Sequence, residues 1–375
     1  MVEISQPTPL LGGLSPAQFM RRHWQKKPLL VRGAVPGIEP ILTRAKLFEL
    51  ASHDDVESRL VLQARGKWQL QRGPFARRSL PPVSQPNWTL LVQGVDLHDD
   101  HAHALLRRFA FVPQARVDDL MISWASEGGG VGPHFDSYDV FLLQVEGRRR
   151  WRIGRQKDLA LRDGVPLKIL AKFEPQEEHL LEPGDMLYLP PRWAHDGVAQ
   201  GECQTYSIGF RAPSRGELAR EVLERLAEGA GEVAGDAIYR DPKQPATRAP
   251  GKVPRELAAF ARDGLKAALK DDDALERALG EMLTEPKPSV WFESGQGGSK
   301  AGAIALDRRT RMMYDARHVF INGESLRAGG KDAKLMHALA DTRTLTAKQV
   351  GHASDAAREV LASWVEAGWA HSRKE

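Results

Sequence analysis

Short apolar runs separated by turn residues dominate the chain between residues 56 and 211. The runs are rich in Val, Ile, Leu, Thr and aromatic residues, which is the composition of β-strands. Strands that recur at this spacing favour a closed barrel or a double-sheet jelly roll. The strands predicted in this way are 59–62, 88–92, 119–124, 140–145, 150–153, 186–189 and 204–208. We therefore predict a mainly β fold with helices added to it.

Helical patterns lie on both sides of this β-rich part. Ser15 and Pro16 have the residue types of an N-cap and a first helical position, so they predict a helix over 14–20, followed by a strand over 27–31. Beyond residue 211 the composition changes, and apolar residues at helical spacing predict helices. Their ranges are 217–228, 255–270 and 272–284. The stretch 241–254 is rich in Pro, Lys and Arg and lacks apolar periodicity, so we expect a linker or exposed loop.

The last ninety residues alternate between short strand-like and helix-like stretches. The predicted strands lie near 289–293, 302–306, 312–315 and 318–321, and the predicted helices near 331–341, 346–351 and 354–368. Helices with a small sheet between them resemble a winged-helix module. The chain is thus expected to divide into a β domain over 1–212, a helical region over 213–285 and a winged-helix-like domain over 286–375.

Composition narrows the class of protein. The 375 residues exceed the usual size of one domain, and 53 basic against 49 acidic residues leave a net charge of only +4. The single cysteine, Cys203, excludes an intramolecular disulfide and suits a reducing cytoplasm. No apolar run approaches the length of a membrane span, and the N-terminus lacks the layout of a signal peptide. We expect a soluble cytoplasmic protein that does not bind membranes.

The sequence Gly132-Pro133-His134-Phe135-Asp136 and the distant His195 are the most informative residues for function. Residues two apart on a strand point to the same side, so His134 and Asp136 offer two ligands together. A turn-rich return through Pro190-Pro191 can bring His195 beside them. Two imidazoles and one carboxylate on one face of a metal leave three positions open, as non-haem Fe(II) oxygenases require. We therefore predict a metal site made of His134, Asp136 and His195.

A second group of possible ligands lies at His98-Asp99-Asp100-His101-Ala102-His103, which offers enough donors for zinc. It precedes the helical run 104–109, so its acidic and polar residues are better explained as a solvated helix start at the positive end of the helix dipole. Asp271, Asp272 and Asp273 precede another predicted helix and are interpreted in the same way.

Over most of its length the chain resembles the bacterial ribosomal oxygenases of the JmjC class, which are similar to cupins. The likeness runs from Trp24-Gln25-Lys26-Lys27-Pro28 through the glycine-rich stretch 128–141 to the winged-helix region. The resemblance implies Fe(II) bound by His134, Asp136 and His195, and 2-oxoglutarate as cosubstrate with dioxygen. It also implies hydroxylation of an arginine in a large-subunit ribosomal protein, and a homodimer, with which the apolar stripes of the helices over 217–284 agree.

The distal carboxylate of 2-oxoglutarate needs a fixed cation, and an arginine fork meets it best. The resemblance assigns this role to Arg149. If Glu146-Gly147 forms a hairpin turn, Arg149 pairs with Gln144 and shares its face. One straight strand would put Gln144 roughly 26 Å from Asp136, at about 3.3 Å per residue, so the chain must corner near residues 137–139. Ser123 and Ser207, on flanking strands, are expected to complete the hydrogen bonds of that carboxylate.

Several neighbours of these residues have two interpretations. Three aromatic residues either line the pocket or belong to the core: Trp124, Tyr138 and Trp193. Three carboxylates either bind a substrate guanidinium or act as surface groups or partners of a ligand histidine: Glu127, Asp139 and Asp196. Cys203 is expected to be a buried strand residue and not a nucleophile.

Two alternatives to arginine hydroxylation remain open. The same chemistry could act on a histidine or a methylated lysine of another protein. In the other alternative, the winged helix binds DNA and the cupin domain senses a small molecule, although the predicted recognition helices carry modest positive charge. Basic residues concentrate between Arg148 and Lys172, and again at Arg72, Arg77 and Arg78. That surface could meet ribosomal RNA or an acidic partner, or be a solvated face.

Overall fold

The computed structural model describes residues 3–64, 66–295 and 302–373, which form two compact units. The first unit comprises Met1–Ala212 and Ser289–Trp291, and the second comprises Pro213–Pro288 and Phe292–Glu375. Among the described residues, no helix is long and apolar enough to cross a lipid bilayer.

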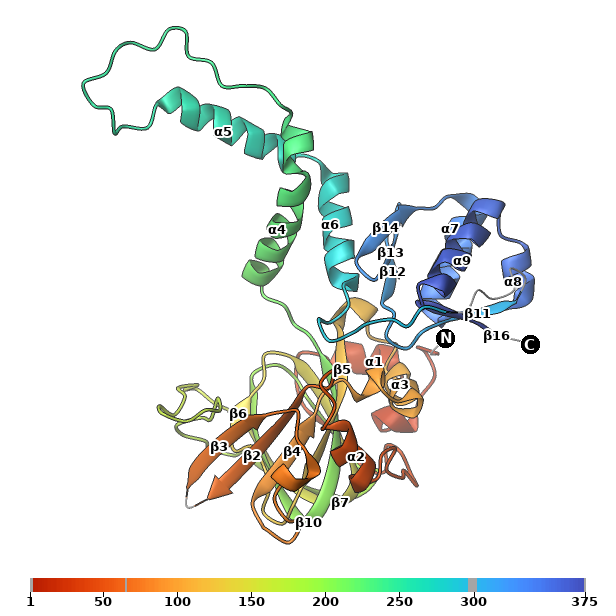
Figure 1. Cartoon of the computed structure of the whole chain (residues 1–375). Coiled ribbons are helices and arrows are strands. Elements are labelled where there is room, and N and C mark those ends of the chain that lie inside the picture. The colour runs from red at the N-terminus through yellow and green to blue at the C-terminus, as the bar shows by residue number, and fades with distance from the viewer. Residues whose placement is uncertain (1–2, 65, 296–301, 374–375) are drawn as a thin grey trace. The chain divides into compact units, whose positions relative to one another are not determined.

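The first unit is a double-stranded β-helix with added helices, as expected (Figure 1). Its strands are β1 (Leu29–Val31), β2 (Ser58–Ala64), β3 (Lys67–Arg72), β4 (Trp88–Val92), β5 (Val117–Ala125), β6 (His134–Phe135), β7 (Asp139–Arg155), β8 (Glu177–Leu181), β9 (Met186–Leu189) and β10 (Trp193–Phe210). Its helices are α1 (Pro16–Arg22), α2 (Arg44–Leu50) and α3 (Asp100–Arg107). The predicted cap is present, since Ser15 forms a capping box with Gln18. Asp99 caps α3 by accepting hydrogen bonds at its start.

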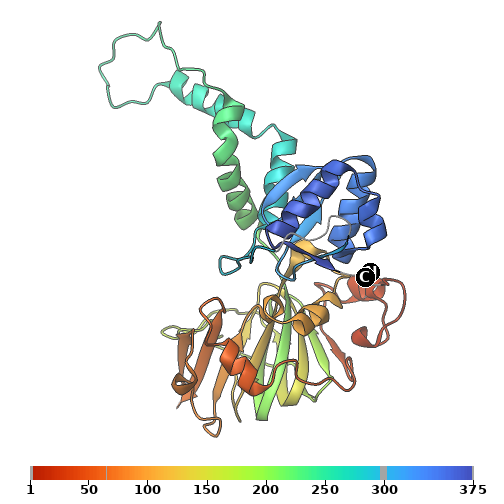
Figure 2. The same ribbon diagram turned by 45° about the vertical axis from the view of Figure 1, so that its right-hand side comes forward.

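The long strands β7 and β10 hold the two layers together because each contributes to both. One layer has the order β1-β9-β7-β10-β5-β4-β2-β3. In the other, β8 pairs with the second half of β7 and β6 pairs with the first half of β10. Figure 2 shows the antiparallel strands of this unit side by side.

Two apolar clusters lie on opposite sides of the larger layer. One packs helices α1, α2 and α3 against it and includes Phe19, Phe48 and Trp124. The other is smaller, lies inside the barrel and includes Leu142, Trp151 and Leu187. Each fully buried large side chain contributes about 1.5–3 kcal/mol, so the outer cluster supplies most of the hydrophobic stabilisation. The barrel interior is left with room for polar residues.

The second unit contains helices and two small sheets. Its helices are α4 (Arg215–Ala234), α5 (Arg255–Ala268), α6 (Asp272–Thr284), α7 (Gly330–Thr342), α8 (Ala347–Gly351) and α9 (Asp355–Glu366). Its strands are β11 (Ala303–Leu306), β12 (Met312–Tyr314), β13 (His318–Ile321), β14 (Glu324–Arg327), β15 (Thr344–Leu345) and β16 (Ala370–Arg373). The sheets have the orders β15-β11-β16 and β12-β13-β14, and α7, α8 and α9 share one apolar core with them. Residues 241–254 contain no helix or strand, as predicted.

Two local predictions are wrong. Glu146 and Gly147 do not form a hairpin turn, because β7 continues through them and bends where β10 bulges opposite, between Gln200 and Gln204. Residues 289–293 form no strand, since their apolar residues meet no pairing strand and follow the prolines at 286 and 288. The polar edge strands β3 and β8 were not predicted, because their exposed positions carry few apolar residues.

Candidate metal centre

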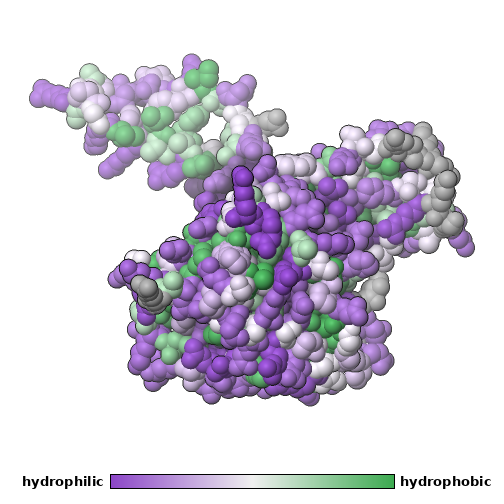
Figure 3. Space-filling view, turned by 60° about the horizontal axis from the view of Figure 1, so that its bottom comes forward, coloured by the Kyte–Doolittle hydropathy of each residue, from purple (hydrophilic) through white to green (hydrophobic). Residues whose placement is uncertain are grey.

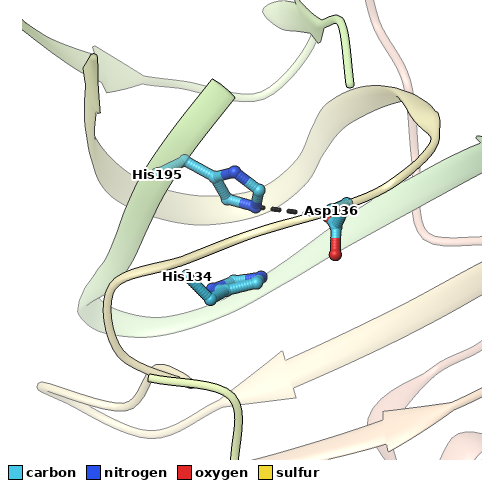
Figure 4. A group of neighbouring side chains, drawn as sticks. All are labelled: His134, Asp136 and His195. Carbon is cyan, nitrogen blue, oxygen red and sulfur yellow. Dashed lines mark ion pairs between the residues drawn. The ribbon is translucent and has the colours of Figure 1, made fainter. Parts of the chain in front are cut away.

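The residues predicted as metal ligands meet at one point inside the barrel. His134 on β6 and His195 on β10 are register partners on adjacent antiparallel strands, and Asp136 follows β6 directly. Figure 4 shows the three side chains pointing toward one another. Their ligand atoms all lie within 4.8 Å of one another, with His195 Nε2 at 3.5 Å from Asp136 Oδ2. Within the described ranges, this is the one group of His, Cys, Asp or Glu side chains with such geometry.

Backbone carbonyls fix the orientation of both imidazoles. His134 Nδ1 lies 2.8 Å from the carbonyl oxygen of Gly132, and His195 Nδ1 lies 3.0 Å from that of Trp193. A neutral imidazole that donates from Nδ1 presents the lone pair of Nε2 to its other side, which is how metal-ligating histidines are commonly held. Burial lowers the pKa of His195 to about 4, and the adjacent His134 adds to this shift. The ring is therefore neutral near pH 7 and available to a cation. The donor set fits a divalent metal such as Fe(II).

Arg149 is buried in the barrel interior and has few hydrogen-bond partners. Its side chain is 5% exposed, and the hydrogen bond from Nη1 to Ser123 Oγ is long, at 3.4 Å. Nε and Nη2 are buried with no hydrogen-bond partner. A buried guanidinium without an acceptor costs several kcal/mol, so this geometry calls for an anion that the chain does not itself provide.

Strand bulges, and not the predicted hairpin, bring Arg149 to this side. Leu142 and Gln144 face the barrel interior on the first half of β7, whereas Arg149 and Trp151 do so on the second half. The register shift against β10 changes which residues alternate inward. The predicted corner is present, since the chain bends at Ser137 and Tyr138 between β6 and β7.

The two predicted serines lie near each other on paired strands. Ser123 on β5 is the register partner of Thr205 and donates to its carbonyl oxygen at 3.2 Å. Ser207 is half-buried and, two residues further along β10, lies on the same face as Thr205. Thr205 donates to Gln144 Oε1 at 2.8 Å, so these two interior polar groups satisfy each other.

Trp151 lies between Arg149 and His195, and the sequence analysis did not predict it as part of the site. Arg149 lies over its ring, with 5.7 Å from the guanidinium carbon to the ring centroid, and the same ring lies 5.8 Å from that of His195. Gly197 makes this possible, because a Cβ there would come within 2.6 Å of the indole. The signal available in the sequence was its position two residues after Arg149 on the same strand.

The three candidate carboxylates for a substrate guanidinium are engaged elsewhere. Asp139 is fully buried and accepts hydrogen bonds from Tyr188, Gln25 and Arg116. Asp196 pairs with Arg152 at 2.5 Å, and Glu127 accepts from the backbone of Gly201. These bonds support a structural role for all three.

The candidate aromatic residues separate into two groups. Trp124 belongs to the outer core, where it packs on Phe48 and Trp88. Trp193 supplies the carbonyl that orients His195. Tyr138 follows Asp136 by two residues and packs against the apolar cluster inside the barrel. Burial, with a smaller contribution from the charge of Asp136, raises the pKa of its hydroxyl well above the usual value.

The remaining candidates have the structural roles expected of them. Cys203 is buried with Ala125 and Ala199. Asp99 caps α3 by accepting hydrogen bonds from the backbone N–H groups of His101 and Ala102. This supports the interpretation of the group as a helix start and not as a zinc site. Asp271 caps α6 in the same manner.

Comparison with known proteins gives the class first. The sequence profile of the JmjC domain matches residues 104–218, which contain all three converging ligands, and that of the ROXA-like winged helix matches residues 267–371. Fold and site together are those of a JmjC-type oxygenase.

Relatives that match nearly the whole chain then define the family. The ribosomal protein uL16 3-hydroxylase of Escherichia coli is 36% identical over 94% of this chain and 96% of its own length. A crystal structure of E. coli YcfD superimposes with a TM-score of 0.84, at 31% identity, covering 96% of this chain and 98% of that one. YcfD in complex with cobalt and 2-oxoglutarate gives a TM-score of 0.77, also at 31% identity, over 95% of this chain and 98% of that one. The chain belongs to the JmjC-class ribosomal oxygenases, a family of metal- and 2-oxoglutarate-dependent hydroxylases.

Proposed function

We propose that this protein uses Fe(II) and 2-oxoglutarate to hydroxylate an arginine side chain of ribosomal protein uL16, in the cytoplasm. The observation that carries the proposal is the convergence of His134, Asp136 and His195, together with a buried Arg149 that has two nitrogens without a hydrogen-bond partner. The uL16 substrate is taken from the E. coli relative, whose name states it. A DNA-binding regulator is not proposed, because the chain belongs to an enzyme family.

His134, Asp136 and His195 would hold the iron. Their ligand atoms come from one side, since β6 and β10 present both imidazoles on the same face and Asp136 continues from β6. When bound, iron with 2-oxoglutarate and dioxygen supplies the oxidising power to insert one oxygen atom into a C–H bond, as 2-oxoglutarate becomes succinate and carbon dioxide. The side chains do not transfer protons in this scheme, and they contribute by positioning and by excluding water.

Arg149 would bind the distal carboxylate of 2-oxoglutarate. Its Nε and Nη2 form two adjacent donors, which match the bidentate geometry of a carboxylate. The ring of Trp151 beneath it fixes the plane of the guanidinium, and Ser123 fixes Nη1. Ser207, on the face of Thr205, would add a hydroxyl donor. Gln144 and Thr205 bond to each other and so do not compete for the anion.

The choice of arginine as the target residue follows from the resemblance of the chain to the bacterial ribosomal oxygenases, which the stretch from Gly132 to Asp136 carries. Histidine is the alternative target, and the experiment below distinguishes the two.

Mass spectrometry of uL16 tests the function. Purified protein is incubated with iron, ascorbate, 2-oxoglutarate and uL16, and the modified peptide is sequenced. We expect a gain of one oxygen atom on an arginine, absent with Asp136→Ala. Modification of another residue type would show that arginine is not the target. Oxidation that persists in Asp136→Ala would contradict the assignment of Asp136 as a metal ligand. Arg32→Ala, which changes an exposed arginine paired with Asp185, serves as control.

A homodimer formed through the helical region is part of the proposal. Exposed apolar side chains gather on α4, α5 and the segment that joins them, where Figure 3 shows hydrophobic residues clustered. They are Leu223, Val233, Ile238, Val253, Leu257, Phe260, Leu265 and Leu269. Exposed apolar patches of this kind mark interaction surfaces. Light scattering should give twice the chain mass for the native protein and a monomer for Phe260→Asp/Leu265→Asp, and a native monomer at micromolar concentration would contradict the proposal.

A further inference from the structure

Positive charge is concentrated in one segment of the first unit. Residues 148–172 hold nine basic and two acidic residues, a formal charge of +7. The whole chain carries +4, so all remaining residues together carry −3. Arg149 faces the barrel interior, which leaves eight of these cations for the surface. The uneven distribution indicates a local surface charge and not a generally basic protein.

The cations form a row on β7 that continues into a loop. Arg148, Arg150 and Arg152 alternate on the side of β7 that faces away from the barrel interior, at about 6.6 Å intervals. The loop 156–176 between β7 and β8 then carries Lys157, Arg162, Lys168 and Lys172. We call Arg148, Arg150, Arg152, Arg155 and these four residues the basic strip.

The loop part of the strip is anchored next to the metal centre. Ile169 and Leu170 are buried, and Leu170 N–H donates to the carbonyl oxygen of Pro133 at 2.8 Å. Pro133 precedes the ligand His134. Further backbone bonds join Arg162 to Ile169 and Ala171 to Ala160, so the backbone of the loop that carries the cations is fixed at these points.

Few of these cations are neutralised by the protein. Arg152 pairs with Asp196 and Lys172 with Glu174. Across the described part of the chain, no ion pair is formed by the other six, which are Arg148, Arg150, Arg155, Lys157, Arg162 and Lys168. Unpaired like charges that follow one another along a strand and a loop repel, and an external polyanion would relieve this repulsion.

We propose that the basic strip binds the sugar-phosphate backbone of RNA. The choice of RNA among polyanions rests on the proposed function, because uL16 belongs to an RNA-containing particle, whereas a basic protein alone would be repelled by the strip. Guanidinium groups match phosphate oxygens bidentately, and the regular row suits a repeating anion. The one aromatic residue of the β7 part, Trp151, is buried, so bases have no exposed ring to stack on there. Binding is therefore indifferent to sequence and sensitive to salt.

Fluorescence anisotropy with a labelled RNA of mixed sequence tests the strip in the full-length protein. If four to six cations bind phosphates, affinity should fall about 50- to 300-fold between roughly 50 and 200 mM salt. Arg148→Glu/Arg150→Glu and Lys157→Glu/Lys168→Glu should each weaken binding at least tenfold and lower the salt slope by about one for each cation that no longer binds a phosphate. Arg21→Glu/Arg22→Glu, which makes the same charge change at two exposed positions of α1, should bind like the native chain. Thermal melting confirms that each variant is folded.

Several results would overturn the proposal. One is the absence of RNA binding by the native protein at about 50 mM salt. Another is an equal loss of RNA affinity in the α1 control. A third is a loss of RNA affinity in Lys331→Glu/Lys334→Glu on α7 and not in the strip variants. Equal binding to anionic phospholipid vesicles or to polyglutamate would reject RNA as the partner. His134→Ala separates the two hypotheses, since it should lose hydroxylation and retain RNA binding. A protein that hydroxylates uL16 without binding RNA would contradict the strip and leave the proposed function intact.

Discussion

Two buried arginines, one in each unit, show how the same side chain serves opposite purposes. Arg343, 8% exposed in the second unit, donates from Nη1 to the carbonyl oxygen of Thr310 at 2.9 Å and from Nη2 to that of Asp307 at 2.5 Å. Arg149, 5% exposed in the barrel, has one long hydrogen bond and two nitrogens without acceptors. The protein supplies acceptors where the arginine is structural and withholds them where a ligand is expected.

Of the changes that test this comparison, removal of a metal ligand should have the largest effect on metal binding and activity. We expect His195→Ala to abolish cobalt binding and turnover of 2-oxoglutarate, a loss well beyond the 10- to 100-fold typical of changes around a ligand. Isothermal titration with cobalt measures this, and Arg343→Met, far from the ligands in sequence and in another unit, serves as the control. Native-like cobalt affinity in His195→Ala would contradict the site.

A pair of matched substitutions tests the arginines directly. Arg149→Met should raise the KM for 2-oxoglutarate roughly 10- to 150-fold, since hydrogen bonds to charged groups are worth about 1.5–3 kcal/mol. It should leave the stability of the ligand-free protein unchanged or higher, because it removes a buried cation with unsatisfied donors. Arg343→Met should destabilise the second unit by roughly 1–3 kcal/mol for each carbonyl left without a donor, with little change in KM. Urea unfolding and steady-state kinetics measure the two effects, and the same pattern in both variants would end the comparison.

The buried Asp307 should make the second unit sensitive to acid. Burial alone would raise the pKa of Asp307, but hydrogen bonds from Arg309 and His371 outweigh it and hold the pKa well below the usual value. The carboxylate therefore stabilises the fold above the unfolded pKa of about 3.9, and this contribution is lost as pH falls below that value. Asp307→Asn should cost roughly 1–3 kcal/mol near neutral pH and progressively less in acid. A stability difference that does not change with pH would show that the charge is not responsible.

The smallest effect is expected at the serine next to Arg149. The bond from Arg149 Nη1 to Ser123 Oγ is 3.4 Å long, so Ser123→Ala should raise the KM for 2-oxoglutarate by a factor of only about 2–10. Ser52→Ala, at an exposed helix end, is the matched control. An effect as large as that of Arg149→Met would show that the hydroxyl, and not the guanidinium, dominates binding of the carboxylate.

Local patterns were sufficient to predict much of the fold. The strands of the barrel, the capping residue Ser15 and the helices of the second unit depend on residues close in sequence. The prediction that His134 and Asp136 lie on the same side of the chain also depends only on strand geometry over three residues. Edge strands such as β3 and β8 were missed because exposed strands need no apolar alternation.

The sequence by itself determined which side chains are available: two histidines, an aspartate and an arginine of suitable spacing in a β-rich chain. Only the tertiary structure decided that β7 bends through Gly147 instead of reversing, that His195 pairs with His134, and that Arg149 meets so few acceptors. The reason is that register, bulges and the absence of partners depend on hydrogen bonds between segments distant along the chain, which no local pattern of residues specifies.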